Sequence, residues 1–196
     1  MESDVNRPIK LQTMRTIYAV IAAVVLLLWS TLSHAQDYTT RKGQVQFSSS
    51  TSAELIEATN NDVAARLSAD GKGLFIIPVK SFRFKKALMQ EHFNENYMES
   101  DHYPKATYNF TVTDIERVDL NTPGRYSVRT KGTMAIKDVK RDIEVPGYIV
   151  VADDKTIRIE ADFSVVPADY NIVIPKLVEN KIARTIKVKV NSSLNK

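Results

Sequence analysis

The sequence predicts an all-β domain of about eight antiparallel strands, with one short helix in the middle of the chain. Three long segments alternate strictly between apolar and polar residues, as strands with one buried face do: residues 106–113, 126–137 and 155–166. Only residues 86–98 have the spacing of an amphipathic helix. Strands that each bury one face form either a sandwich or a closed barrel, and the pattern alone does not choose between them.

The remaining strands and turns follow from shorter signals. Two strands are expected around residues 43–47 and 63–67. The pair Asp70-Gly71 predicts a hairpin turn because it readily supplies positive φ, and a strand over 74–84 follows, in which Pro78 marks an edge or a bulge. Further turns are predicted at 121–124 and 152–154, and a last strand at 182–190.

The expected helix over residues 86–98 has two distinct faces. Met89, Phe93 and Tyr97 recur at i, i+4 and i+8 and form an apolar face. Glutamates at 91, 95 and 99 form an acidic face, and residues 100–104 end the helix.

Residues 1–35 are interpreted as a secretory signal peptide. Lys10 and Arg15 precede an apolar run over 17–32, and the small residues Ser33 and Ala35 favour cleavage before Gln36. The alternative is an uncleaved membrane anchor, but this apolar core is shorter than the roughly 20 residues that a spanning helix needs. The expectation is therefore a periplasmic or secreted domain over residues 36–196, long enough to form one core.

Composition excludes several kinds of chemistry. The chain has no cysteine, which excludes disulfides and thiolate catalysis or metal binding. Its net charge of +4 is modest, and its basic residues are scattered along the strands, so nucleic-acid binding is not expected. Lys181, Arg184, Lys187 and Lys189 are interpreted as a charged edge strand. Transient contact with anionic lipid and a homodimer both stay open.

No catalytic or metal-ligating set is predicted, and no cofactor is expected. His92 and His102 are ten residues apart, whereas two histidines that bind one metal from a helix are four residues apart. The chain also lacks the Gly-x-Ser-x-Gly pattern of a serine hydrolase.

Several segments, in order and spacing, resemble the YceI-like family of exported bacterial proteins. They are residues 78–84, 92–100, 103–108, 132–136, 162–164 and 169–172. The chain departs from the family pattern at Asp138, where a glycine is usual before Val139, and at Glu160-Ala161, where an arginine is often found. The resemblance implies an eight-stranded, lipocalin-like antiparallel barrel whose apolar interior holds a polyisoprenoid or a similar long amphiphile.

With this resemblance, a set of residues on expected inward faces becomes the candidate ligand-binding set, although each of them also fits a plain core. The set is Phe82, Phe84, Phe93, Tyr97, Tyr108, Phe110, Tyr126, Met134, Ile136, Ala161 and Phe163. The tyrosines at 97, 108 and 126 are expected near a polar headgroup at the mouth, because a buried hydroxyl needs a partner.

Three functions are weighed. The leading hypothesis is a periplasmic, non-catalytic carrier of an isoprenoid-type or other long-chain lipid. The alternative is a ligand-free barrel that binds another envelope protein. A weaker reading is a small enzyme that uses His92.

Overall fold

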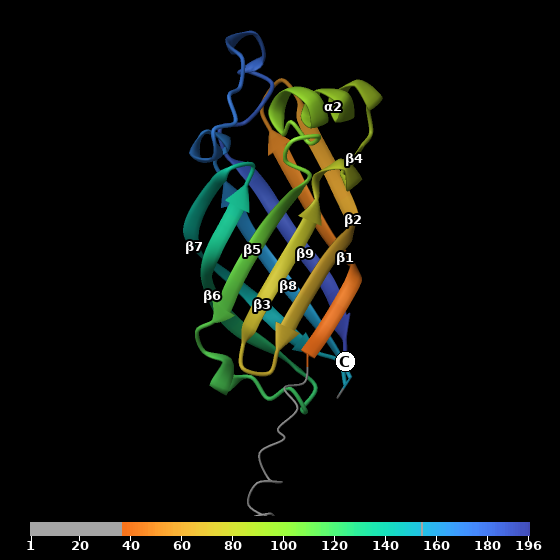
Figure 1. Ribbon diagram of the computed structural model, residues 1–196, viewed down its shortest axis with the longest axis vertical. Helices are drawn as coiled ribbons and strands as arrows, with labels where there is room; N and C mark the ends of the chain where they lie inside the picture. The colour runs from red at the N-terminus through yellow and green to blue at the C-terminus, as the bar shows by residue number, and fades with distance from the viewer. Residues whose placement is uncertain (1–36, 154) are drawn as a thin grey trace, which may run out of the picture. The chain divides into compact units, whose positions relative to one another are not determined.

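The computed structural model describes residues 37–153 and 155–196, so the expected signal peptide and Asp154 lie outside the described residues. Eight antiparallel strands pair in chain order, and β1 pairs with both β2 and β9, which closes the sheet into a barrel (Figure 1). The strands are β1 Asp37–Ser50, β2 Leu55–Ser68, β3 Lys72–Pro78, β5 Lys105–Val112, β6 Gly124–Ile136, β7 Val139–Val151, β8 Thr156–Val165 and β9 Ile186–Asn195. A two-residue strand, β4 Arg83–Phe84, pairs with β2. The predicted barrel is confirmed.

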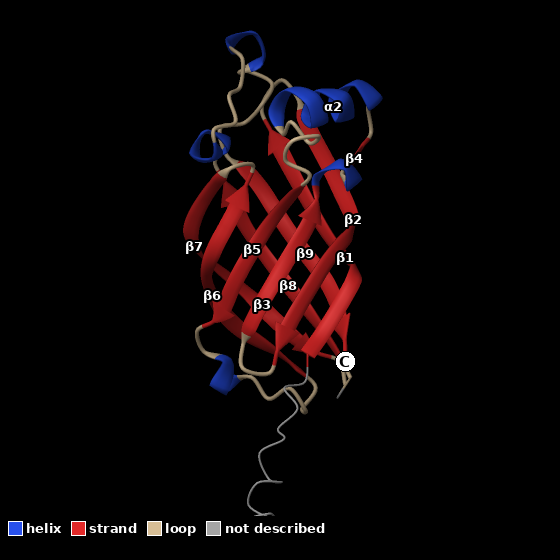
Figure 2. Ribbon diagram, viewed as in Figure 1, coloured by secondary structure: helices blue, strands red, loops and turns tan. Residues whose placement is uncertain are grey.

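The two ends of the barrel differ. One end, called the helix end, carries α2 Ala87–His92, the turn η2 Phe93–Tyr97 and the short η1 Val79–Ser81. The same end carries residues 166–185, called the roof loop, with η4 Pro167–Tyr170 and η5 Lys176–Val178 (Figures 1 and 2). The opposite end, called the turn end, carries short connections and η3 Ile115–Arg117. Within the described ranges, no helix has both the length and the hydrophobicity needed to cross a membrane.

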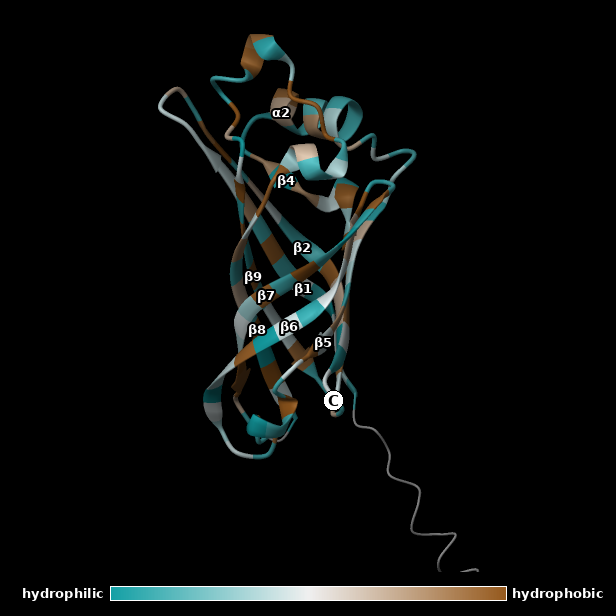
Figure 3. Cartoon of the chain, turned by 90° about the vertical axis from the view of Figure 1, so that its left-hand side faces the viewer, coloured by the Kyte–Doolittle hydropathy of each residue, from teal (hydrophilic) through white to brown (hydrophobic). Residues whose placement is uncertain are grey.

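Alternation along each strand separates the interior from the surface (Figure 3). In β6, Val128 and Met134 are buried, whereas Arg129 and Lys131 are exposed and pair with Glu144 on β7. The polar face is therefore the outside of the barrel, and the apolar faces meet within it.

The interior is filled at the turn end. Apart from Val79 in η1, the most deeply buried apolar side chains, each less than 2% exposed, gather in the half of the strands nearest that end, and they include Tyr38, Leu67, Leu194, Ile149 and Ile157. Asp70 organises the adjacent hairpin, because its carboxylate accepts bonds from the Lys72 ammonium, the Ser68 hydroxyl and the Lys72 amide, and these bonds lower its pKa. Gly71 has φ of 84°, so the predicted Asp-Gly turn is confirmed.

The helix is confirmed, but it is not a regular α-helix throughout. After α2 the backbone widens into a π-type turn, in which the Met98 amide donates to the Phe93 carbonyl at 2.9 Å. Such widened turns change which side chains share a face. The glutamates at 91, 95 and 99 are exposed, as expected.

The β6–β7 hairpin forms without the glycine that is usual in the family. Ile136 pairs with Val139, so Lys137 and Asp138 make a two-residue turn. Lys137 supplies the positive φ, 55°, and its ammonium pairs with Glu99. Lys137 thus has a backbone conformation that non-glycine residues rarely adopt, and its ion pair connects the hairpin to the loop after η2.

Several strand predictions were incomplete, and the strand expected over 74–84 ends at Pro78, just before η1. β1 and β2 are much longer than the expected segments, because buried polar residues interrupt the apolar pattern. Asn60, fully buried on the inner face of β2, donates to the Pro78 carbonyl at 2.8 Å and accepts from the Asp62 amide at 2.9 Å. The last strand begins at Ile186, not at Ile182.

Candidate functional site

The barrel encloses an apolar cavity of about 340 Å³ that extends toward the helix end. Leu67, Val112 and Ile149 lie at its deep end, and β-strands from every side form its wall. Its volume falls within the range of ligand pockets, about 300–1,000 Å³. The barrel is therefore hollow toward the helix end and filled at the turn end, which is called the base.

Four phenylalanines from separate elements pack together at the helix end of the cavity. Phe47 on β1 meets Phe82, Phe84 on β4 and Phe93 on η2, with ring centroids 5.1–5.7 Å apart. Edge-on and tilted ring pairs of this kind contribute about 0.5–1.5 kcal/mol beyond their burial. This cluster fixes the helix against the mouth of the barrel.

A second aromatic group lines the wall. The Phe110 ring stacks on Tyr108 at 5.1 Å and on Phe75 at 5.9 Å. Gly73 makes room for it, because a Cβ at this position would lie 2.1 Å from Phe110 Cζ. The missing side chain thus lets a flat aromatic surface form on the inside of β3 and β5.

The polar atoms deep in the cavity are already satisfied by the protein. The Tyr108 hydroxyl donates to Thr130 Oγ1 at 2.9 Å, and Thr130 Oγ1 donates to the Val145 carbonyl at 3.1 Å. Burial raises the pKa of Tyr108, so its hydroxyl stays neutral. The wall therefore presents hydrocarbon and aromatic carbon to a ligand.

The titratable side chains Glu160 and His92 lie at the edge of the cavity and not inside it. Glu160 borders the cavity, but its carboxylate accepts bonds from Arg158 and Arg125, which lower its pKa. His92, on the exposed side of α2, lies 3.0 Å through Nδ1 from the Asn96 amide. Among the described residues, no cluster of three or more His, Asp or Glu side chains could hold a metal ion.

Three polar side chains line the mouth at the helix end. His92 and Tyr97 line it from the helix, and burial raises the pKa of Tyr97. Ser49, which is 2% exposed, lines it from β1 and accepts a 2.8 Å bond from the Ala183 amide of the roof loop. A ligand with a polar head would therefore find its hydrogen-bonding groups here.

Ten of the eleven candidate residues lie on the cavity wall: Phe82, Phe84, Phe93, Tyr97, Tyr108, Phe110, Met134, Ile136, Ala161 and Phe163. Whether they contact a ligand stays a prediction.

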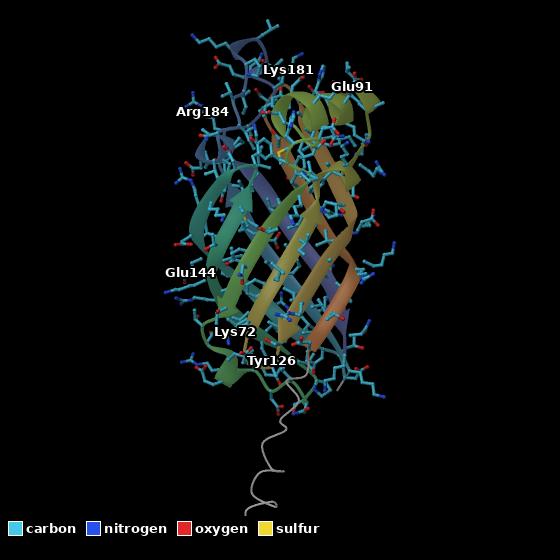
Figure 4. All side chains as sticks on the ribbon, viewed as in Figure 1. Lys72, Glu91, Tyr126, Glu144, Lys181 and Arg184 are labelled. Carbon is cyan, nitrogen blue, oxygen red and sulfur yellow. The ribbon has the colours of Figure 1, made fainter. Side chains whose placement is uncertain are left out.

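Two tyrosines are not at the mouth as expected: the Tyr108 hydroxyl is hydrogen-bonded to Thr130 deep in the cavity, and Tyr126 does not line the cavity at all. It lies near the start of β6, at the turn end, where its hydroxyl donates to the Thr122 carbonyl at 3.0 Å (Figure 4). It packs against the filled base, not against the cavity. The alternation of apolar and polar residues along a strand indicates whether a side chain lies on the inner or the outer face of the barrel. It does not indicate how far along the barrel axis the residue lies.

Part of the cavity wall comes from the roof loop and was not among the candidate residues. Ile172, Ile174 and Ile182 line the cavity although they belong to no strand. The alternation Ile172-Val173-Ile174 was a signal, since it places two isoleucines on one side of an extended segment. Phe47 and Phe75 were also missed, although both lie on apolar faces of expected strands.

Comparison with known proteins gives one family. The YceI-like domain model matches residues 34–194. Among curated proteins, none matches this chain significantly.

Solved structures share the fold at low sequence identity. A polyisoprenoid binding domain from Saccharophagus degradans, implicated in plant cell wall breakdown, matches with a TM-score of 0.73 and 16% identity, over 83% of this chain and 99% of that one. Burkholderia cenocepacia BcnA matches with a TM-score of 0.65 and 16% identity, over 78% and 96% of the two chains. The Campylobacter jejuni YCEI protein matches with a TM-score of 0.53 and 12% identity, over 85% and 87%.

Proposed function

The chain belongs to the YceI-like domain family, and from this premise we propose that its barrel binds a polyisoprenoid or a similar long-chain lipid without transforming it. The observation that carries the proposal is the 340 Å³ cavity, whose deep wall is apolar and whose deep polar atoms are satisfied internally. A hydrocarbon chain gains about 0.8 kcal/mol for each CH₂ removed from water. The similar domain from Saccharophagus degradans is described as polyisoprenoid binding, which supports the same ligand class here.

The ligand enters with its chain toward the filled base and its head toward the helix end. Leu67 and Ile149 limit the depth that the chain reaches, because the barrel below them is packed. His92 and Tyr97 at the mouth offer a hydrogen-bonding ring nitrogen and hydroxyl to a polar head. Selectivity thus depends on cavity depth and on a few polar groups at one end.

The carrier acts outside the cytoplasm, in the periplasm. Support comes from the sequence of residues 1–35, with basic residues, an apolar run and a small-residue cleavage pattern. A lipid that crosses an aqueous compartment needs its chain shielded from water. This task requires neither a nucleophile nor a cofactor.

Native mass spectrometry tests the proposal most directly. The full chain is expressed in a bacterial host, the exported protein is purified without detergent, and its mass is compared with that of residues 36–196. We expect an excess mass that extracts into organic solvent as a long-chain lipid. A bare mass, together with no uptake of added geranylgeraniol, would contradict the proposal and favour a ligand-free barrel that binds a protein.

A further inference from the structure

The large hydrophobic residues that the barrel exposes are concentrated at one end. Of six such residues in the described ranges, five lie at the helix end, and only Tyr148 lies on the barrel wall. The five are Leu55 (59% exposed), Leu88 (61%), Val166 (38%), Val173 (79%) and Leu177 (89%). Single exposed leucines are ordinary on protein surfaces, but their segregation to one end indicates a contact surface.

The roof loop combines these apolar side chains with basic charge. Its residues 166–185 carry Lys176, Lys181 and Arg184 against two acidic residues, Glu179 and Asp169, and Asp169 is already paired with Arg141. Within the described part of the chain these three basic groups are all exposed and form no ion pair. By contrast, Lys85 and Lys86 on the other side of the mouth are paired with Glu57 and Glu54.

The roof loop also projects beyond the barrel and borders the cavity. Figure 1 shows η5 above the helix end, and Figure 4 shows Lys181 and Arg184 on the same side of the molecule. Ile172 and Ile174 line the cavity, whereas Val173 between them is exposed. One face of this segment therefore touches the ligand space and the other face is free.

We propose that Val173, Lys176, Leu177, Lys181 and Arg184, here called the docking tip, bind the surface of an anionic phospholipid bilayer. Leu177 and Val173 enter the boundary between headgroups and acyl chains, and the basic groups contact lipid phosphates. Docking would allow lipid exchange through the adjacent mouth, and this purpose rests on the proposed function. The docking itself does not depend on it.

The charge distribution favours an anionic bilayer and sets an orientation on it. The acidic face of the helix, with Glu91 and Glu95 exposed, lies at the same end of the barrel (Figure 4). An anionic surface repels these carboxylates and attracts the docking tip. The barrel therefore tilts so that the roof loop contacts lipid and the acidic face stays in water.

Vesicle flotation tests the docking tip. Protein purified from cells expressing the full chain is mixed with vesicles of phosphatidylglycerol and phosphatidylcholine in equal parts, or of phosphatidylcholine alone. Each basic residue near the surface strengthens binding about fivefold, so Lys176→Gln with Lys181→Gln weakens binding to the anionic vesicles by about 25-fold. Val173→Ser with Leu177→Ser weakens it by at least about tenfold, since two buried apolar side chains are lost.

The matched control changes the same charge at the opposite end. Arg117→Gln with Lys155→Gln removes two exposed basic groups from the turn end and leaves vesicle binding unchanged. All variants share one N-terminus, so a contribution of residues 1–36 cancels in the comparison. Salt weakens wild-type binding, and neutral vesicles bind it less than anionic ones.

Three results would overturn the docking tip: no binding of the wild-type protein to anionic vesicles, equal binding by wild type and both docking-tip variants, or equal loss in the control. If the wild-type protein binds a protein partner but does not bind anionic vesicles, the docking tip is overturned as well. Geranylgeraniol uptake is measured in parallel by native mass spectrometry. Docking without uptake overturns the proposed function alone, and uptake without docking overturns the docking tip alone.

Discussion

At the scale of single residues, small side chains on inner faces determine where the barrel stays hollow. Ala161 on β8 pairs with Gly147 on β7, and both line the cavity. The filled base has larger groups at the equivalent inward positions, such as Ile149 and Ile157. The volume of the cavity is thus set by a few short side chains within an otherwise bulky wall.

Ala161→Phe is expected to weaken lipid binding while the fold is kept. The added ring projects into existing space, so its main effect is to occupy the volume that a ligand chain needs. Uptake of geranylgeraniol by native mass spectrometry measures binding, and circular dichroism measures the fold. Thr111→Phe adds a ring to the outer face of β5 and serves as the control; equal uptake by a folded Ala161→Phe protein and this control would remove Ala161 from the site.

The ion pair between Lys137 and Glu99 predicts a loss of stability in acid. The Lys137 side chain is 8% exposed, and its hydrogen bond and charge lower the pKa of Glu99. A carboxyl whose pKa is lowered by folding stabilises the protein above its unfolded pKa, about 4.3 for glutamate. That contribution is lost as the pH falls through the lower, folded value.

Glu99→Gln should therefore be less stable than wild type near neutral pH, and the difference should shrink in acid. Urea unfolding at about pH 7 and about pH 3 measures the two differences. Glu95→Gln, which changes an exposed carboxylate with no ion pair among the described residues, is the control. A difference between Glu99→Gln and wild type that is the same at both pH values would show that the ion pair has no role in stability.

At the scale of elements, the roof loop is tied to the barrel at several points, one of which is the 2.7 Å bond that Arg141 on β7 donates to the Asp169 carbonyl. The Ala183 amide donates to the Ser49 hydroxyl at 2.8 Å, and Ser49 is buried at the mouth. The isoleucines of the same loop pack into the cavity. The loop thus covers part of the mouth while its outer face remains exposed.

Ser49→Ala is expected to loosen the roof loop. It leaves the Ala183 amide without its partner, which costs about 1–3 kcal/mol. Hydrogen exchange at Ala183 should become faster, and release of bound lipid should become faster with it. Ser48→Ala, on the outward side of β1, is the control, and unchanged exchange at Ala183 in Ser49→Ala would mean that the hydrogen bond does not hold the loop.

How much the sequence predicts also differs between elements. β5, β6 and β8 follow clean alternation and lie within one or two residues of their expected bounds. β7 was not identified, because it begins with the polar run Lys140-Arg141-Asp142 and contains Pro146 and Gly147. Its place depends on pairing with β6 and β8, which no local pattern contains.

The same distinction applies to the candidate site. Alternation placed Phe110, Met134 and Phe163 on the inner face, where they line the cavity. It could not place Tyr126 below the cavity, because height in a barrel depends on strand register around the whole sheet. It also did not place Ile174 in the wall, since the path of the roof loop across the mouth depends on contacts that no local pattern contains.

At the scale of the whole molecule, the barrel combines a packed base with a hollow helix end. Closure leaves no free sheet edge between β1 and β9, and the chain achieves this without a disulfide. Packing at the base holds the strands in register. Contacts in the hollow part are fewer, so the ligand supplies part of the packing there.

Bound lipid should therefore stabilise the entire barrel. A ligand present at 100 times its dissociation constant adds about 2.7 kcal/mol to the free energy of unfolding. For a domain of this size, each kcal/mol raises Tm by about 2–4 °C. Protein extracted free of lipid should unfold about 5–10 °C below the lipid-loaded form, and added geranylgeraniol should restore the difference.

The variant Ala161→Phe separates this effect from nonspecific stabilisation. Its cavity is already occupied by a side chain, so its Tm should respond little to extraction or to added lipid. A lipid that merely adheres to the outside of the barrel would raise the Tm of wild type and variant alike. Equal shifts in both proteins would therefore place the lipid outside the cavity, and no shift in either would favour a barrel that functions empty.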